Sequence, residues 1–135
     1  MDTTLLIQCS HLILRKDIVL FLMIFLHVID DFCLQGIMAS MKQKSWWQEH
    51  PIGSSPKYKN DYIAALFAHS FSWSFMIMLP VMLWGQWEWP ILIANMFTHA
   101  AIDDAKANKM QINLIQDQTC HLIQILMTWL IFVVI

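Results

Sequence analysis

Histidine and aspartate side chains recur at helical spacing within otherwise apolar stretches of this 135-residue chain. Three stretches each contain one histidine and one aspartate four residues apart: His27 and Asp31, His99 and Asp103, and His121 and Asp117. A further apolar stretch contributes His69, with Ser70 beside it. Residues at i and i+4 lie on one face of a helix, so each pair would present an imidazole and a carboxylate together. The pattern predicts one polar centre assembled from several helices.

The chemistry of this donor set points to a divalent metal. Imidazole and carboxylate together suit zinc, manganese or iron better than magnesium, which prefers oxygen ligands and water. We therefore expect zinc, with manganese and iron as alternatives, held as one ion with outer carboxylates or as two ions bridged by a carboxylate. The competing interpretation is that the polar residues pair with one another and only stabilise the packing of the helices. The predicted ligands are His27, His69, His99, His121, Asp31, Asp103 and Asp117.

Four residues are predicted to take part in catalysis: Asp31, Asp103, Asp117 and Lys106. The aspartates would act as ligands, bridging groups or general bases in metal-assisted hydrolysis, in which the metal lowers the pKa of a bound water toward about 7. Lys106 follows Asp103 by three residues, and could hold an anionic group of a substrate or simply pair with Asp103. Asp30 lies about 60° from the His27 face of a regular helix, so Asp31 is preferred over it.

The elements that would position these residues are long apolar helices. Hydrophobic residues make up 58% of the chain and charged residues 13%, whereas an ordinary soluble domain carries roughly 25% charged residues. The composition excludes a disordered chain and a coiled coil, and the formal net charge of -2 gives no basic surface for nucleic acid. The class that remains is an integral membrane protein, in which membrane lipids are the immediate partners.

Four stretches approach the roughly 20 apolar residues that a spanning helix needs. They cover residues 18–39, 61–83, 90–107 and 114–135, and residues 3–14 would form a short interfacial helix. We therefore predict an all-α fold. It would be a single integral membrane domain over residues 1–135, built as a four-helix transmembrane bundle with a short N-terminal interfacial helix. The pattern leaves the oligomeric state open.

The distribution of lysines predicts the orientation. Six lysines lie in or beside the first and third connections, and only Arg15 and Lys16 lie on the opposite side. The positive-inside rule then places these two connections in the cytoplasm. His69, His99 and His121 would each lie about eight residues from that side, or roughly 12 Å deep at 1.5 Å per residue. A substrate reaching such a centre would be a lipid headgroup or a lipid-linked compound.

Four short motifs together carry a resemblance to a known family. They read His27-Val-Ile-Asp-Asp31-Phe32-Cys-Leu34-Gln35, then His69-Ser70, then His99-Ala-Ala-Ile102-Asp103-Asp-Ala-Lys106, then Asp117-Gln118-Thr-Cys-His121. In order and spacing, over residues 20–130, they resemble a family of small bacterial and phage inner-membrane proteins of unknown function. That family is similar to predicted membrane-bound metal-dependent hydrolases. The resemblance implies a multi-pass protein of the bacterial inner membrane and supports the polar centre.

A non-enzymatic function is the alternative. The same residues could form a proton or metal pathway, or the structural core of a phage or bacterial membrane effector that excludes other phages. A hydrolase needs an open metal position and a cleft that reaches the headgroup zone. A structural core would instead be closed, with every polar group paired.

Overall fold

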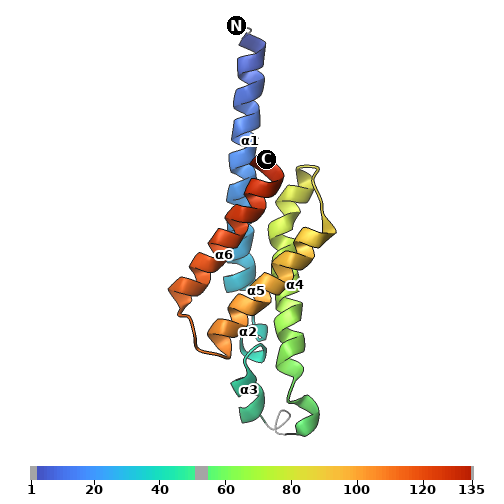
Figure 1. Ribbon diagram of the computed structural model, residues 1–135, viewed down its shortest axis with the longest axis vertical. Coiled ribbons are helices and arrows are strands. Elements are labelled where there is room, and N and C mark those ends of the chain that lie inside the picture. Colours follow the sequence, from blue (N-terminus) through green and yellow to red (C-terminus); the bar gives the residue numbers. More distant parts are fainter. Residues whose placement is uncertain (1–2, 51–54, 135) are drawn as a thin grey trace.

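The computed structural model describes the backbone of residues 3–50 and 55–134, and the side chains of residues 16–50 and 55–133. All regular structure in these ranges is helical (Figure 1). The all-α prediction is therefore confirmed for the described part of the chain.

Four long helices make up the body of the molecule. They are α1 (Thr3–Val28), which continues into the π-helical turn η1 (Ile29–Leu34), α4 (Asp61–Leu83), α5 (Trp89–Ala107), and α6 (Leu114–Trp129) with the π-helical turn η3 (Leu130–Val134). Each packs against two others, because α1 and α5 both contact α4 and α6. Successive long helices run in opposite directions, so the first and third connections lie at the same end (Figure 1). The predicted stretches 61–83, 90–107 and 114–135 match α4, α5 and α6 closely, although Ile135 lies outside the described residues.

The first connection contains helical structure that the sequence did not reveal. Two short helices, α2 (Met38–Met41) and α3 (Lys44–Glu49), precede the 3-10 turn η2 (Pro56–Tyr58). Trp47 of α3 is buried, and its indole nitrogen donates a hydrogen bond to the carbonyl of Met41 at 2.6 Å. Asn108, which follows α5, accepts a hydrogen bond from the backbone nitrogen of Lys44 at 2.7 Å. These contacts fasten the α2–α3 segment to the end of the bundle.

The N-terminal segment differs from its prediction in two ways. Residues 3–14 do not form a separate interfacial helix but are the first part of α1, which extends beyond the other helices in Figure 1. The physical reason is that residues 3–34 contain neither glycine nor proline, the residues that break helices. The helical run then ends before Gly36, whose φ of +48° is left-handed, and not near Ala39 as predicted.

Gly36 should therefore resist substitution by residues with a β-carbon. A β-carbon placed there would meet no atom within 4 Å, so only the backbone conformation opposes it. Left-handed backbone costs an ordinary residue roughly 1–2 kcal/mol, and asparagine tolerates it better. We expect Gly36→Ala to lower the Tm of the purified protein and Gly36→Asn to lower it less. Ser40→Ala, in the adjoining helix α2, is the control, and an unchanged Tm for Gly36→Ala would contradict this account.

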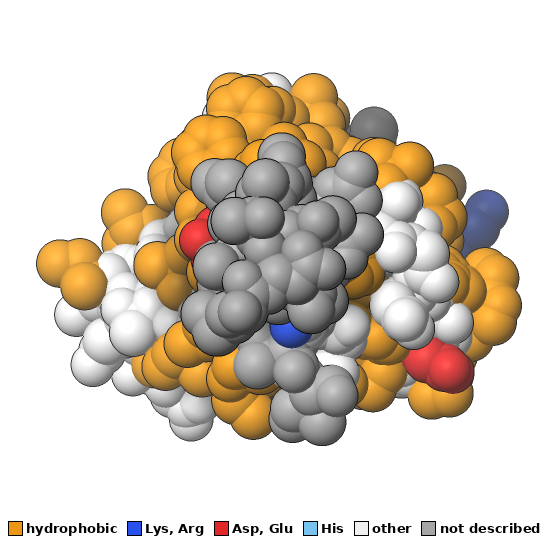
Figure 2. Space-filling model, turned by 90° about the horizontal axis from the view of Figure 1, so that it is seen from above, with side chains coloured by type: hydrophobic (Ala, Val, Ile, Leu, Met, Phe, Trp, Pro, Cys, Tyr) orange, Lys and Arg blue, Asp and Glu red, His pale blue; other side chains and the backbone are white. Residues whose placement is uncertain are grey.

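Beside a buried hydrophobic core, the molecule buries charged and titratable side chains and exposes many large apolar ones. Buried side chains include four histidines, three aspartates and a lysine: His27, His69, His99, His121, Asp30, Asp103, Asp117 and Lys42. Large apolar side chains are exposed on all four long helices, among them Phe21, Phe25, Phe71, Phe75, Ile93, Phe97, Leu122 and Ile123. Hydrophobic side chains form much of the outline seen from the end where the N-terminus lies (Figure 2).

One helical stretch in the described residues, Pro56–Leu83, is long and apolar enough to cross a membrane. Half of its most apolar part is buried inside the molecule, as is also found for core helices of soluble proteins. The four-span bundle therefore stays a prediction at this stage.

Candidate metal centre

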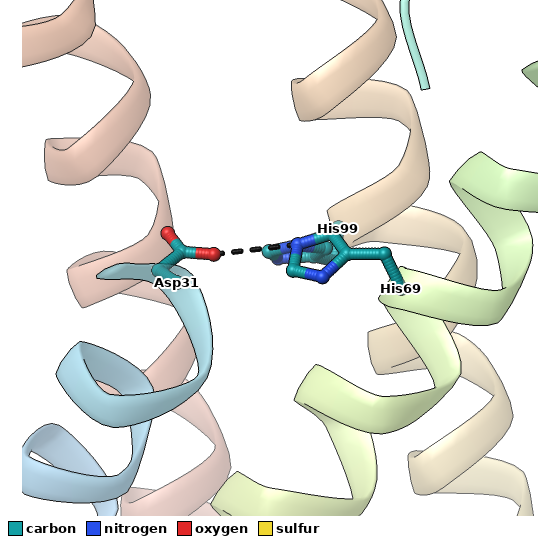
Figure 3. A group of neighbouring side chains, drawn as sticks. All are labelled: Asp31, His69 and His99. Atoms are coloured by element: carbon teal, nitrogen blue, oxygen red, sulfur yellow. Dashed lines mark hydrogen bonds and ion pairs between the residues drawn. The ribbon is translucent and has the colours of Figure 1, made fainter. Parts of the chain in front are cut away.

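His69 lies at the middle of a group of side chains from three helical elements. Its Nε2 is 3.1 Å from Nε2 of His99 and 3.3 Å from Oδ1 of Asp31. Figure 3 shows these three side chains pointing toward one another from α4, α5 and η1. Oδ2 of Asp103 is 3.5 Å from Nε2 of His69 and 3.6 Å from Nε2 of His99. Nε2 of His69 therefore lies within 3.5 Å of a ligand atom from each of the other three side chains.

The spacing fits a tetrahedral metal ion. Zinc binds histidine nitrogen at about 2.0–2.1 Å, so the ligand atoms of a tetrahedral site lie roughly 3.3–3.4 Å apart. The four separations given above, 3.1–3.6 Å out of the six in a tetrahedral set, bracket that value. The amide nitrogen of Gln35 now lies 3.0 Å from both His69 Nε2 and Asp31 Oδ1, so it would have to turn away from a bound ion. Asp31, His69 and His99 could hold a metal ion.

A second group shares residues with the first. His99, Asp103 and His121 also bring one ligand atom each close enough to hold a metal ion. Oδ1 of Asp103 lies 3.4 Å from Nε2 of His121, while Oδ2 faces the first group. Oδ1 of Asp117 lies 3.5 Å from the same nitrogen of His121. The two oxygens of Asp103 thus face two different groups, as those of a bridging carboxylate do.

Several buried atoms of the second group lack hydrogen-bond partners among the described residues. They are Nδ1 and Nε2 of His121, Nδ1 of His99 and Oδ1 of Asp117. Buried polar atoms in native proteins are nearly always paired, and an exception requires an explanation such as a water or an ion. Nε2 of His121 and Oδ1 of Asp117 are ordinary metal donor atoms, so the donor set fits a divalent cation.

Aromatic packing fixes the orientation of the imidazole rings. The indole of Trp73 stacks on His99 with ring centroids 4.2 Å apart, and His99 stacks on His121 at the same distance. Trp73 is fully buried and belongs to the hydrophobic core that lies beside the centre. The ring stack therefore ties the two histidines of α5 and α6 to the packing of α4.

The turn η1 brings two consecutive aspartates to the same centre. Asp30 accepts a hydrogen bond from the hydroxyl of Ser72 at 2.7 Å, and its other oxygen is 3.6 Å from Nδ1 of His69. Asp31 accepts a hydrogen bond from the amide of Gln118 at 3.0 Å. A π-helix closes i→i+5 hydrogen bonds and has a wider turn than an α-helix, which moves residue positions away from regular α-helical angles. The preference for Asp31 alone assumed a regular α-helix, and the structure adds Asp30.

His27 lies apart from both groups. Its Nδ1 accepts a hydrogen bond from the indole of Trp73 at 2.8 Å, and its Nε2 lies 3.1 Å from Oε1 of Gln118. Because Nδ1 is an acceptor, Nε2 carries the proton and donates it to Gln118. Both ring nitrogens are engaged, so among the four predicted histidine ligands His27 is the one that the structure does not bring to a metal position.

Two lysines neutralise the central aspartates. Nζ of Lys42, immediately after α2, donates to Oδ2 of Asp103 at 2.6 Å, and both side chains are buried. Nζ of Lys106 donates to Oδ2 of Asp117 at 2.7 Å and its side chain is 34% exposed. The expected alternative of a Lys106–Asp103 pair is therefore wrong, because Lys42 occupies that place and Lys106 reaches across to α6.

A cavity of about 330 Å³ lies beside the centre, between η1, the α2 segment and the adjoining ends of α5 and α6. Asp31, Asp103 and the two lysines line its inner part. Phe32, Met110 and Leu114 also line it, and because these three side chains are exposed the cavity reaches the molecular surface. Two carboxylates of the centre, Asp31 and Asp103, are thus accessible from outside.

Comparison with known proteins leaves the family open. No protein-family model, no curated protein and no solved structure matches this chain. The resemblance to small inner-membrane proteins therefore stays a prediction based on the four motifs.

Proposed function

We propose that this protein is a multi-pass membrane protein that binds divalent metal and hydrolyses a lipid or lipid-linked substrate. The membrane location is supported by the exposed apolar side chains on all four long helices and by the buried polar centre, since polar groups at membrane depth face the bundle interior. The antiparallel packing of those helices is compatible with four spans.

The observation that carries the proposal is the combination of unpaired donor atoms with an access route. Nε2 of His121 and Oδ1 of Asp117 are buried and make no hydrogen bond within the described part of the chain, although they face each other at 3.5 Å, and a cavity leads from the neighbouring Asp103 to the surface. A structural polar core, or the core of a non-enzymatic phage effector, would be closed and paired throughout. The open, incompletely paired arrangement favours metal-dependent hydrolysis over those alternatives.

The proposed ligands follow from the two groups. Asp31, His69 and His99 would hold one ion, and His99, Asp103 and His121 a second, with Asp117 beside His121 and Asp30 orienting His69 through Nδ1. Imidazole and carboxylate donors suit zinc, with manganese and iron as alternatives. When bound, the metal supplies Lewis acidity and a water of lowered pKa. Asp117, through its unpaired oxygen, is placed to accept a proton, and Lys106 to hold an anionic group of the substrate.

Metal analysis coupled to turnover tests the proposal. Protein purified in detergent without added metal should contain zinc, manganese or iron in amounts stoichiometric with the chain. A chelator should abolish hydrolysis of phospholipids or lipid-linked phosphates, and the same metal should restore it. If the purified protein contains no metal, the centre is a structural polar core. Metal-bound protein without turnover on any lipid substrate would favour a metal or proton pathway.

The proposed topology places Ser55 in the cytoplasm. In a variant with Cys9, Cys33 and Cys120 replaced by serine, we expect Ser55→Cys to react with an impermeant thiol reagent only after cell lysis. Gln86→Cys, in the exposed connection between α4 and α5, is the matched control and should react in intact cells. Labelling of Ser55→Cys from outside would reverse the orientation, and equal labelling of both in intact cells would argue against a membrane crossing.

A further inference from the structure

The cavity beside the metal centre has two cationic groups on its walls. Lys42 and Lys106 both line it, and they come from separate segments, the end of α2 and the end of α5. An ammonium group has three N–H donors. Each of these two makes one hydrogen bond, to Asp103 or to Asp117, within the described residues. Two donors on each lysine therefore stay free for a molecule in the cavity.

Charge balance indicates when those donors would take an anion. The four aspartates Asp30, Asp31, Asp103 and Asp117 and the two lysines together carry a formal charge of -2 when the histidines are neutral. One divalent cation neutralises this charge, and a second leaves an excess of +2. A phosphate dianion would restore neutrality. Metal bound by Asp103 would also weaken the hold of that carboxylate on Lys42, since the cation and the ammonium group would share its negative charge.

The mouth of the cavity is apolar. Phe32, Met110 and Leu114 line it and are all more than half exposed, at 60, 83 and 54%. The side-chain amides of Gln35, Gln43 and Gln118 line the same cavity and add neutral hydrogen-bonding groups. A ligand with a charged head and an apolar tail matches this arrangement of cationic and apolar side chains. Its head would lie between the lysines, and its chain would cover the exposed apolar side chains.

We propose that this cavity binds the phosphate group of an amphiphile, with Lys42 and Lys106 as its cationic contacts, once the metal centre is filled. This inference rests on the proposed function and specifies its substrate as a phosphate-bearing lipid. The phosphate would lie beside Asp103, the carboxylate shared by the two groups, and its chain would run past Phe32 and Leu114 into the surrounding membrane.

Phosphate binding by metal-loaded protein tests this assignment. Isothermal titration with inorganic phosphate, after dialysis to remove free metal, should show binding that disappears when the metal is stripped. Lys106→Met and Lys42→Met should each weaken phosphate binding by about tenfold, the loss of one charge-assisted contact. Lys109→Met is the matched control, because that ammonium pairs with Asp104 at 2.8 Å and does not line the cavity. Metal content measured on every variant shows whether the centre is intact.

The source of the phosphate is distinguished by a second measurement. Phosphatidic acid in nanodiscs of phosphatidylcholine should bind at least about tenfold more tightly than inorganic phosphate, an advantage that Phe32→Ser and Leu114→Ser should reduce. Equal affinity for the two would overturn the amphiphile assignment. Normal metal content with no phosphate binding, or with binding insensitive to both lysines, would overturn the inference while leaving the metal centre standing. Absence of metal from the wild-type protein would instead refute the proposed function itself.

Discussion

Replacing His99 with alanine is expected to remove most bound metal from the protein. His99 belongs to both groups of potential ligands, so its loss opens a coordination position in each. The exposed apolar side chains are untouched, so under the proposed membrane location the variant should still be recovered from the membrane fraction as a monodisperse species. His121→Ala should remove the metal of the second group and leave part of the total. Metal-to-protein ratios, determined by mass spectrometry of digested samples, provide the measurement.

His27→Asn is the matched control for this experiment. His27 is as deeply buried as His99, but both of its ring nitrogens are already hydrogen-bonded, and asparagine keeps a donor and an acceptor at that position. We expect it to retain nearly all of the metal. Equal metal loss in His27→Asn and His99→Ala would show that any disturbance of the polar core releases the ion, and full retention in His99→Ala would exclude that histidine as a ligand.

Lys42→Met is expected to destabilise the metal-free protein strongly. Lys42 and Asp103 form a buried ion pair with a 2.6 Å contact, and removing one partner of such a pair costs about 3 kcal/mol or more. Lys106→Met removes an ammonium that is one-third exposed, and its cost should be about 1 kcal/mol or less. Thermal unfolding in the presence of a chelator compares the two variants directly.

Two further measurements on Lys42 variants identify the cause of the lower stability. The double variant Lys42→Met with Asp103→Asn should regain much of the stability, because it removes the uncompensated carboxylate as well. In metal-loaded Lys42→Met the deficit should shrink, since the metal supplies the missing positive charge. If the double variant is no more stable than Lys42→Met alone, packing of the lysine stem accounts for the effect, and the ion-pair explanation is wrong.

The polar faces of α5 and α6 follow from sequence spacing. His99 and Asp103, and likewise Asp117 and His121, are four residues apart in uninterrupted apolar stretches, and the helices that form there make each pair share a face. The lengths of those helices were predictable for the same reason. A capping box of Asn113 and Gln116 marks the start of α6 at the predicted position.

Other features depend on tertiary placement that no local pattern records. Lys42 pairs with a residue 61 positions away, and it reaches Asp103 because the α2 segment folds back against the bundle. His27 has the same i, i+4 partner spacing as His99, yet the neighbouring indole of Trp73 takes its Nδ1. The prediction of a separate interfacial helix was wrong because the two apolar stretches, with only Arg15, Lys16 and Asp17 between them, continue as one helix.

The π-helical turn η1 makes the centre sensitive to a change in chain length of a single residue. A turn closed by i→i+5 hydrogen bonds contains one residue more than an α-helical turn. An in-frame deletion of one codon within residues 32–34 would let this turn close as a regular α-helix, in which consecutive residues point about 100° apart. Asp30 and Asp31 could then no longer both face His69. In evolutionary terms, one insertion or deletion separates a metal-competent bundle from an inert bundle with the same apolar exterior.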